Sequence, residues 1–116
     1  MAHYFENDKN LKTDLHTVSF SLDGKNFTLE SDAGVFSKDK LDTGTRILLE
    51  TVLKNSMPAG TVLDLGCGIG PVGVVLSAFW NCQVTGIDVN ERACALASQN
   101  YQRNHVKGTV LCQDGV

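Results

Sequence analysis

The sequence has few of the features that mark secreted, metal-binding or membrane-spanning proteins. None of its 116 residues lie in a run that approaches the ~20 apolar residues of a transmembrane helix. The first ten residues lack the apolar core of a signal peptide. Cysteines occur at positions 67, 82, 94 and 112, and no two have the short spacing typical of a metal site. These absences predict a cytoplasmic protein with reduced cysteines, no metal and no membrane partner.

A concentrated positive charge is also missing. Ten basic and thirteen acidic residues give a formal charge of −3, and no basic run reaches five residues. Because nucleic-acid binders often carry a basic face, the composition gives RNA binding no support but does not exclude it. The three histidines, His3, His16 and His105, are scattered and are interpreted as surface residues. A hydrophobic content of 42% in a chain of this length predicts one domain with a modest core.

A β-hairpin is predicted over residues 17–31. Apolar and polar residues alternate from Thr17 onward, which is typical of a half-buried strand. Asp23-Gly24 indicates a two-residue hairpin turn, because both central positions of that turn need positive φ. A turn there keeps the large apolar side chains on one face and pairs Leu22 with Lys25, Phe20 with Phe27 and Val18 with Leu29.

A helix is predicted to follow the hairpin. Asp42 is a suitable N-cap, and Pro58 and Gly60 stop a helix that runs to about Asn55. We interpret residues 1–60 as an N-terminal extension. The predicted inward stripe of the helix consists of Leu48, Leu49, Val52 and Leu53.

From Thr61 the predicted elements alternate between strand and helix. Pro71 suits the first position of a buried helix, and Asn90 can cap the second helix. Strand, helix, strand, helix, strand is typical of a parallel α/β layer with right-handed crossovers, so the predicted fold class is α/β. The expected ranges are 61–65, 72–80, 82–87, 91–104 and 106–112, with Ala93, Leu96, Ala97 and Tyr101 of the second helix facing inward.

Three acids and three glycines follow the predicted strands. Asp64, Asp88 and Asp114 stand at strand ends, where ligands bind in parallel α/β sheets. A single aspartate there is more often a turn or cap residue, so the prediction depends on the combination. It suits a nucleoside ligand: Asp88 for the ribose hydroxyls, Asp114 for an adenine amine, and Asp64 for the turn or an ammonium group. Gly66, Gly68 and Gly70 permit positive φ and a close approach of backbone N–H groups.

A nicotinamide dinucleotide is the first rival cofactor. Residues 68–73 match the pattern G-x-G-x-x-G, and Asp88 lies twenty residues beyond Gly68. The position of the pattern relative to the strand does not fit a dinucleotide site. In that fingerprint the first glycine follows the strand almost directly, whereas here Gly66 already occupies this place and Asp64 precedes it. A pyrophosphate beside Asp64 would be repelled, whereas a cationic sulfonium with an amino-acid tail would be attracted.

Residues 64–70, with the sequence DLGCGIG, resemble the first motif of class I S-adenosylmethionine-dependent methyltransferases. Residues 88–90 resemble the second motif and residues 113–114 the third. Residues 31–37 and 41–45 are similar to the narrower methyltransferase small domain family, and residues 3–5 agree with it. Members of that family methylate the exocyclic amine of guanine in small-subunit ribosomal RNA, so the resemblance implies a Rossmann-like fold, S-adenosylmethionine as cofactor and ribosomal RNA as substrate.

The resemblance also implies roles for individual residues. The glycine turn would line the methionine and ribose part of the cofactor, Asp88 would hold the ribose, and Asp114 would meet the adenine amine. Phe36 and Gly44 would close over the cofactor from the extension, although Phe36 could equally be a core aromatic. The full set of predicted cofactor residues is Phe36, Gly44, Asp64, Gly66, Cys67, Gly68, Gly70, Asp88, Val89, Asn90 and Asp114.

One family motif is missing from the sequence. The resemblance leads us to expect Asn-Pro-Pro after a fourth strand, yet the only prolines are Pro58 and Pro71. We therefore expect a fold truncated after the third parallel strand, with residues 61–116 as an incomplete cofactor-binding half that binds without catalysis when alone. The strand over 61–65 would then be an open edge that self-associates or pairs with another chain, unless it belongs to a longer protein.

Overall fold

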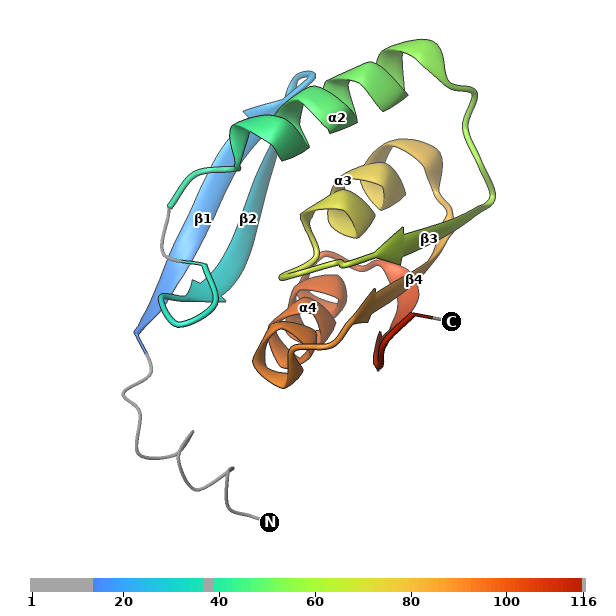
Figure 1. Ribbon diagram of the computed structural model, residues 1–116. Helices are drawn as coiled ribbons and strands as arrows, with labels where there is room; N and C mark the ends of the chain where they lie inside the picture. The colour runs from blue at the N-terminus through green and yellow to red at the C-terminus, as the bar shows by residue number, and fades with distance from the viewer. Residues whose placement is uncertain (1–13, 37–38, 116) are drawn as a thin grey trace.

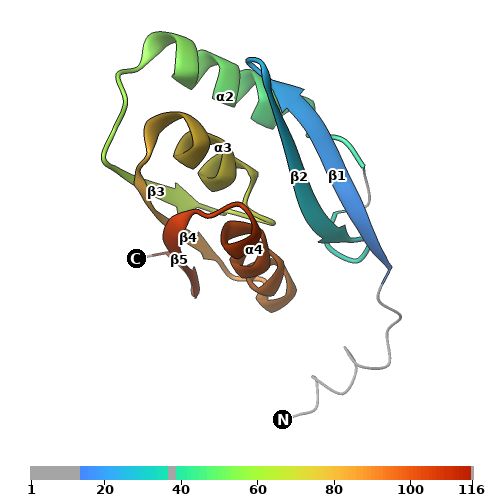
Figure 2. The ribbon, with the colours of Figure 1, turned by 180° about the vertical axis from the view of Figure 1, so that it is seen from behind.

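The computed structural model describes residues 14–36 and 39–115, and the prediction for residues 3–5 lies outside these ranges. Two sheets and three helices make up this described part of the chain (Figure 1). Helices α3 and α4 lie between the two-stranded hairpin and the three-stranded sheet, as the view from behind also shows (Figure 2). The elements are β1 (Leu15–Leu22), β2 (Lys25–Asp32), α2 (Thr43–Asn55), β3 (Thr61–Leu65), α3 (Pro71–Trp80), β4 (Gln83–Asp88), α4 (Glu91–Arg103) and β5 (Lys107–Cys112).

The hairpin forms in the predicted register. Asp23 and Gly24 both have positive φ, of 49° and 85°, as a two-residue turn requires. Strand pairing extends about two residues further down β1 than predicted and brings Leu15 opposite Asp32. The Phe20 and Phe27 rings stack with their centroids 5.3 Å apart, so the predicted apolar face is confirmed.

Helix α2 begins after Asp42, whose carboxylate accepts a hydrogen bond from the Thr45 N–H at 3.1 Å. The predicted inward stripe is wrong at Leu48, which is 52% exposed, whereas Leu49 is fully buried. Neighbouring residues on a helix point about 100° apart, so the orientation of α2 that packs Leu49 into the core leaves Leu48 turned toward solvent.

The predicted parallel layer is confirmed. The sheet has the order β3-β4-β5 with both pairs parallel, and α3 and α4 form the crossovers. The four residues predicted to face inward from α4 are all buried. Helix α3 was predicted to be buried all round, and this is wrong at Ala78, which is exposed although α3 contacts α2, α4, β3 and β4.

Strand β3 is an edge of the sheet as far as the described residues show. It pairs with β4 on one side, and its Leu63 and Leu65 side chains are 52% and 60% exposed. Both helices cover the same face of the sheet (Figures 1 and 2), so these leucines stand on the opposite face. No helix in the described part of the chain is long and apolar enough to cross a membrane.

Candidate functional site

The site is built around the loop between β3 and α3. Gly66, Gly68 and Gly70 of this loop have φ values of 72°, 57° and 97°, a region that favours glycine. The N–H groups of Gly66 and Cys67 both donate to the carbonyl of Ile87, at 2.7 and 2.9 Å. The end of β4 therefore anchors the start of the glycine loop.

Asp88 also shapes this loop. Its Oδ2 accepts a hydrogen bond from the Gly68 N–H and its Oδ1 one from the Asn90 N–H, both at 2.9 Å. The hydrogen bond from Asn90 is the main cause that lowers the pKa of the Asp88 carboxyl, and the Gly68 bond adds to it. Asp88 is therefore a carboxylate at neutral pH, and it joins the glycine loop to the start of α4.

Asp64 has a very different environment. Its Oδ2 is buried, and no hydrogen-bond donor of the described residues reaches it. Burial, followed by the negative charge of Asp88, raises the pKa of the Asp64 carboxyl to about 6. Above that pH the site contains a buried charge without a partner, which a cationic group would stabilise.

Cys67 lies within the loop and is 4% exposed. Burial, and then the charge of Asp64, raises the pKa of its thiol to about 12. The thiol is therefore protonated and is not a nucleophile. All four cysteines are free thiols.

The Tyr101 side chain of α4 packs against the end of the glycine loop and the start of α3. A Cβ added to Gly70, Gly73 or Gly86 would lie 2.9, 2.6 or 2.6 Å from the Tyr101 side chain. Its hydroxyl is buried and has no hydrogen-bond partner within the described residues. Gly73, the last glycine of the G-x-G-x-x-G match, is thus explained by packing against Tyr101 and does not by itself indicate a dinucleotide.

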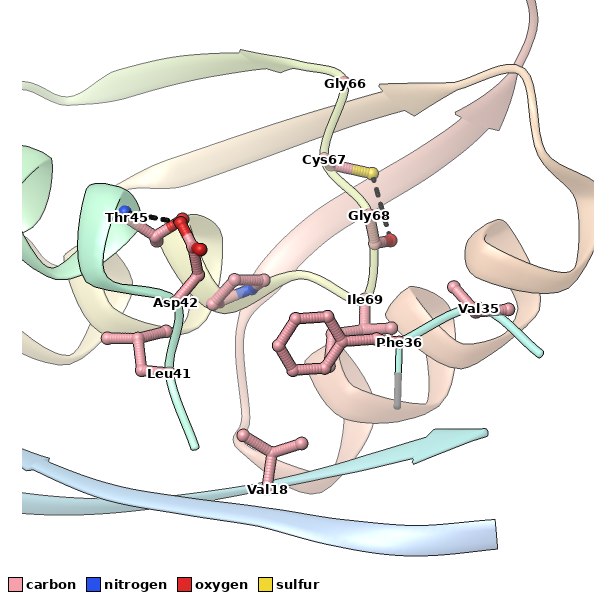
Figure 3. A pocket seen from close by; sticks show the side chains of 11 residues that line it. Val18, Val35, Phe36, Leu41, Asp42, Thr45, Gly66, Cys67, Gly68 and Ile69 are labelled. Carbon is pink, nitrogen blue, oxygen red and sulfur yellow. Dashed lines mark hydrogen bonds between the residues drawn. The ribbon is translucent and has the colours of Figure 1, made fainter. Parts of the chain in front are cut away.

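A pocket of ≈ 290 Å³ opens between the glycine loop and the N-terminal extension (Figure 3). This volume is near the lower end of the roughly 300–1,000 Å³ of small-molecule sites. Figure 3 shows Phe36, Val35 and Ile69 close together, with Asp42 and Leu41 on another wall. The lining residues are Val18, Val35, Phe36, Leu41, Asp42, Thr45, Gly66, Cys67, Gly68, Ile69 and Pro71.

The pocket brings together four of the predicted cofactor residues, Phe36, Gly66, Cys67 and Gly68. Gly44 is not in the lining, although its neighbours Asp42 and Thr45 are.

The other predicted residues lie around the loop and the strand ends. Gly70 is the N-cap of α3, and the Asn90 side chain caps α4 by accepting from the Ala93 N–H at 2.8 Å. Val89 is 66% exposed. Asp114 is exposed, one residue beyond Gln113, whose N–H donates to the Asp88 carbonyl at 2.9 Å. The cofactor roles of all these residues remain predictions.

Sequence reasoning missed several residues of the site. Asp42 was assigned only as a helix cap, and Thr45, which bonds to it, was not singled out. The apolar residues of the pocket lining have sequence patterns like those of ordinary core residues. Asn100, which contacts the loop, was also missed, although a polar residue beside the inward-facing Tyr101 was an available signal. Within residues 14–36 and 39–115, no three histidine, cysteine or acidic side chains are grouped to hold a metal ion.

Comparison with known proteins identifies the family. The sequence model of the methyltransferase small domain matches residues 26–116. The chain is 38% identical, over 96% of its length, to the uncharacterized protein YbxB of Bacillus subtilis, and covers 55% of that protein. It is also 38% identical over 78% of its length to ribosomal RNA small subunit methyltransferase C of Haemophilus influenzae, of which it covers 27%. The chain thus spans about half or less of these relatives.

Solved structures agree with the sequence comparison. The 16S rRNA N2 G1207 methyltransferase RsmC of T. thermophilus, solved with AdoMet and guanosine, matches 86% of this chain with a TM-score of 0.76 and 25% identity. The chain covers 28% of that structure. A tRNA (uracil-54, C5)-methyltransferase of Pyrococcus abyssi, solved with S-adenosyl-L-homocysteine, shares the fold with a TM-score of 0.63 and 21% identity. From its motifs, its fold and these matches, the chain belongs to the methyltransferase small domain family, the S-adenosylmethionine-dependent methyltransferases with a class I, Rossmann-like fold.

Proposed function

We propose that this chain binds S-adenosylmethionine at the glycine loop and forms the cofactor-binding part of a ribosomal RNA methyltransferase. The observation that carries this proposal is the buried, unpartnered Oδ2 of Asp64. S-adenosylmethionine contains a sulfonium and an ammonium group, and either cation would stabilise a carboxylate that has no partner. A dinucleotide pyrophosphate would instead add negative charge beside Asp64 and Asp88.

The rest of the site fits the same ligand. The Asp88 oxygens each accept one backbone N–H, which leaves lone pairs for ribose hydroxyls. The apolar part of the pocket lining, with Val35, Phe36 and Ile69, suits the uncharged part of a nucleoside. When bound, the cofactor would supply an electrophilic methyl group, while the residues of this chain orient it and exclude water.

We further propose that the complete protein methylates the exocyclic amine of a guanine in ribosomal RNA. The relatives named for ribosomal RNA methylation, and RsmC with its bound guanosine, support this substrate. The cytoplasm is the compartment that this substrate and the sequence predict. The sequence given contains no Asn-Pro-Pro segment.

Isothermal titration calorimetry tests cofactor binding. We expect heat from S-adenosylmethionine and S-adenosylhomocysteine and none from NAD at the same concentrations. Stronger binding of NAD would overturn the proposal. Incubation of the bound protein with ribosomal RNA and methyl-labelled cofactor then separates a binding-only chain from an active enzyme, and we expect no transfer by these 116 residues alone.

We propose that the open edge of β3 pairs with a further strand, from a longer protein, a separate chain or a second copy. Leu63 and Leu65 are exposed on this strand, and residues 61–65 contain neither the lysine nor the proline that commonly protect such edges. Light scattering of the purified chain tests pairing with a second copy. A clean monomer at high concentration would exclude self-association through this edge.

A further inference from the structure

Asn100 is a fully buried polar side chain in the centre of the molecule, with 0% exposure. Its Nδ2 donates to the carbonyl of Ile69 at 2.9 Å and to the carbonyl of Glu30 at 3.0 Å. Its Oδ1 accepts from the Glu30 N–H at 2.8 Å. One side chain of α4 thus joins the glycine loop to strand β2 of the hairpin.

Strand β2 offers a free edge to this side chain. In an antiparallel pair the N–H and C=O of one residue point to the same side, and those of Glu30 bond to Asn100, so they point away from β1. The carboxamide of Asn100 therefore takes the place of a peptide group of a neighbouring strand. Two ion pairs strengthen the same contact between α4 and β2: Arg92 with Asp32 at 2.8 Å and Arg103 with Glu30 at 3.4 Å.

The glycine loop needs this outside support. Backbone N–H groups at its start are bound by Ile87, and its middle is bound by Asp88. Asn100 is the residue of α4 whose side chain bonds to the loop backbone itself, at the carbonyl just before Gly70. The hairpin, for its part, supplies Val18 and, through the turn after β2, Val35 and Phe36 to a second wall of the pocket, which meets the glycine-loop wall where Phe36 lies close to Ile69 (Figure 3).

We infer that Asn100 is a positioning residue that holds the hairpin wall and the glycine loop at the correct separation for the cofactor. This inference rests on the proposed function. Asn100 does not line the pocket. It acts through Ile69 on one wall and through β2 on the other, so both walls move relative to each other when its carboxamide is removed.

The test compares Asn100→Ala with a matched control, Asn104→Ala. Asn104 is the C-cap of α4, one turn beyond Asn100. Its Nδ2 donates to the Asn100 backbone carbonyl at 2.9 Å and to the Thr28 carbonyl at 3.4 Å, on the same edge of β2 but without a bond to the loop. Urea titration first checks that both variants are folded. We then expect Asn100→Ala to weaken S-adenosylmethionine binding about tenfold, because the loop loses its one hydrogen bond from the Asn100 amide, at the Ile69 carbonyl. Asn104→Ala should bind within twofold of the wild type.

A double-mutant cycle with Phe36→Ala supplies a readout that general destabilisation would not move. If Asn100 couples the two walls, the losses of affinity in Phe36→Ala and Asn100→Ala will not add in the double variant. Wild-type affinity in Asn100→Ala, or strict additivity, would overturn the inference. If Asn100→Ala does not fold, Asn100→Asp retains the shape and the acceptor but loses both amide donors, and replaces it in the same cycle.

A measurement without cofactor separates this inference from the proposed function. The amide resonances of Gly66, Gly68 and Gly70 should shift in Asn100→Ala and stay in place in Asn104→Ala. If the wild type binds no S-adenosylmethionine, the proposed function fails, and these resonances alone decide whether Asn100 holds the loop. Unchanged loop resonances would refute the positioning role in either case.

Discussion

Asp64 and Asp88 lie at the ends of neighbouring parallel strands and flank the same glycine loop, yet they differ in almost every physical respect. Asp88 accepts backbone hydrogen bonds with both oxygens, and these bonds lower the pKa of its carboxyl. Asp64 has a buried oxygen without a partner, and burial raises the pKa of its carboxyl to about 6. The environment, and not the residue type or the distance to the loop, separates a carboxylate that holds the glycine loop from one whose buried oxygen has no hydrogen-bond partner among the described residues.

Removing the carboxylate that builds the loop should have the larger effect. Asp88→Ala leaves the Gly68 and Asn90 N–H groups without their partner, so we expect a loss of about 3 kcal/mol in the free energy of unfolding, as for hydrogen bonds to a charged group. S-adenosylmethionine affinity should fall by roughly a hundredfold. Urea unfolding and calorimetry measure both. Wild-type stability in this variant would show that the loop does not depend on Asp88.

Removing the charge of the unpartnered carboxylate should separate stability from binding. Asp64→Asn abolishes the repulsion from Asp88 and the buried charge, so the unfolding free energy without cofactor should rise by about 1 kcal/mol at neutral pH. Cofactor affinity should fall roughly thirtyfold, because a cation loses its partner. A parallel loss of stability and affinity would contradict the contrast between the two aspartates.

The pH dependence of binding should be the smallest of the three effects. A cationic ligand prefers ionised Asp64, so affinity should be about tenfold weaker at pH 5 than at pH 7.5, and Asp64→Asn should lose this dependence. Calorimetry in buffers of different ionisation enthalpy would detect the released proton. A flat profile in the wild type would show that Asp64 does not meet the cation.

Stability without cofactor should follow the opposite trend. The folded-state pKa of Asp64 lies above its ordinary 3.8, so the native chain retains a proton that the unfolded chain has released between about pH 4 and 6. This contribution is complete below pH 3.8 and is lost as the pH rises through about 6. The lowered pKa values of Asp88 and Asp32 act the other way, since their contribution is lost as the pH falls below 3.8.

The fold was predictable because its signals are local. The Asp23-Gly24 turn, the caps at Asp42 and Asn90 and the change of period at Thr61 each depend on a few adjacent residues, and each was confirmed. The predicted burial of Leu48 was wrong because the sequence does not say how wide a face α2 buries. The glycines of the loop were also predictable, since positive φ is a local requirement.

The chemistry of the site was less predictable because its contacts are distant in sequence. Asp88 bonds to Gly68 across 20 residues, and Asn100 bonds to Glu30 across 70. No local pattern distinguishes Asp64 from Asp88, because both lie at the carboxyl end of a short strand. Likewise, Gly73 matches a dinucleotide pattern in the sequence, whereas its role depends on Tyr101, which only the folded chain brings close.

The packing of Tyr101 restricts how this family member can evolve. Since Gly70, Gly73 and Gly86 all face one aromatic ring, a methyl group at any of them has no room while that ring is present. A substitution at Gly73 should therefore be accepted only together with a smaller side chain at position 101. Gly70 in addition needs its positive φ, and a Cβ at Gly86 would also meet the Cys67 side chain, so a change at position 101 alone would not make room at these two positions.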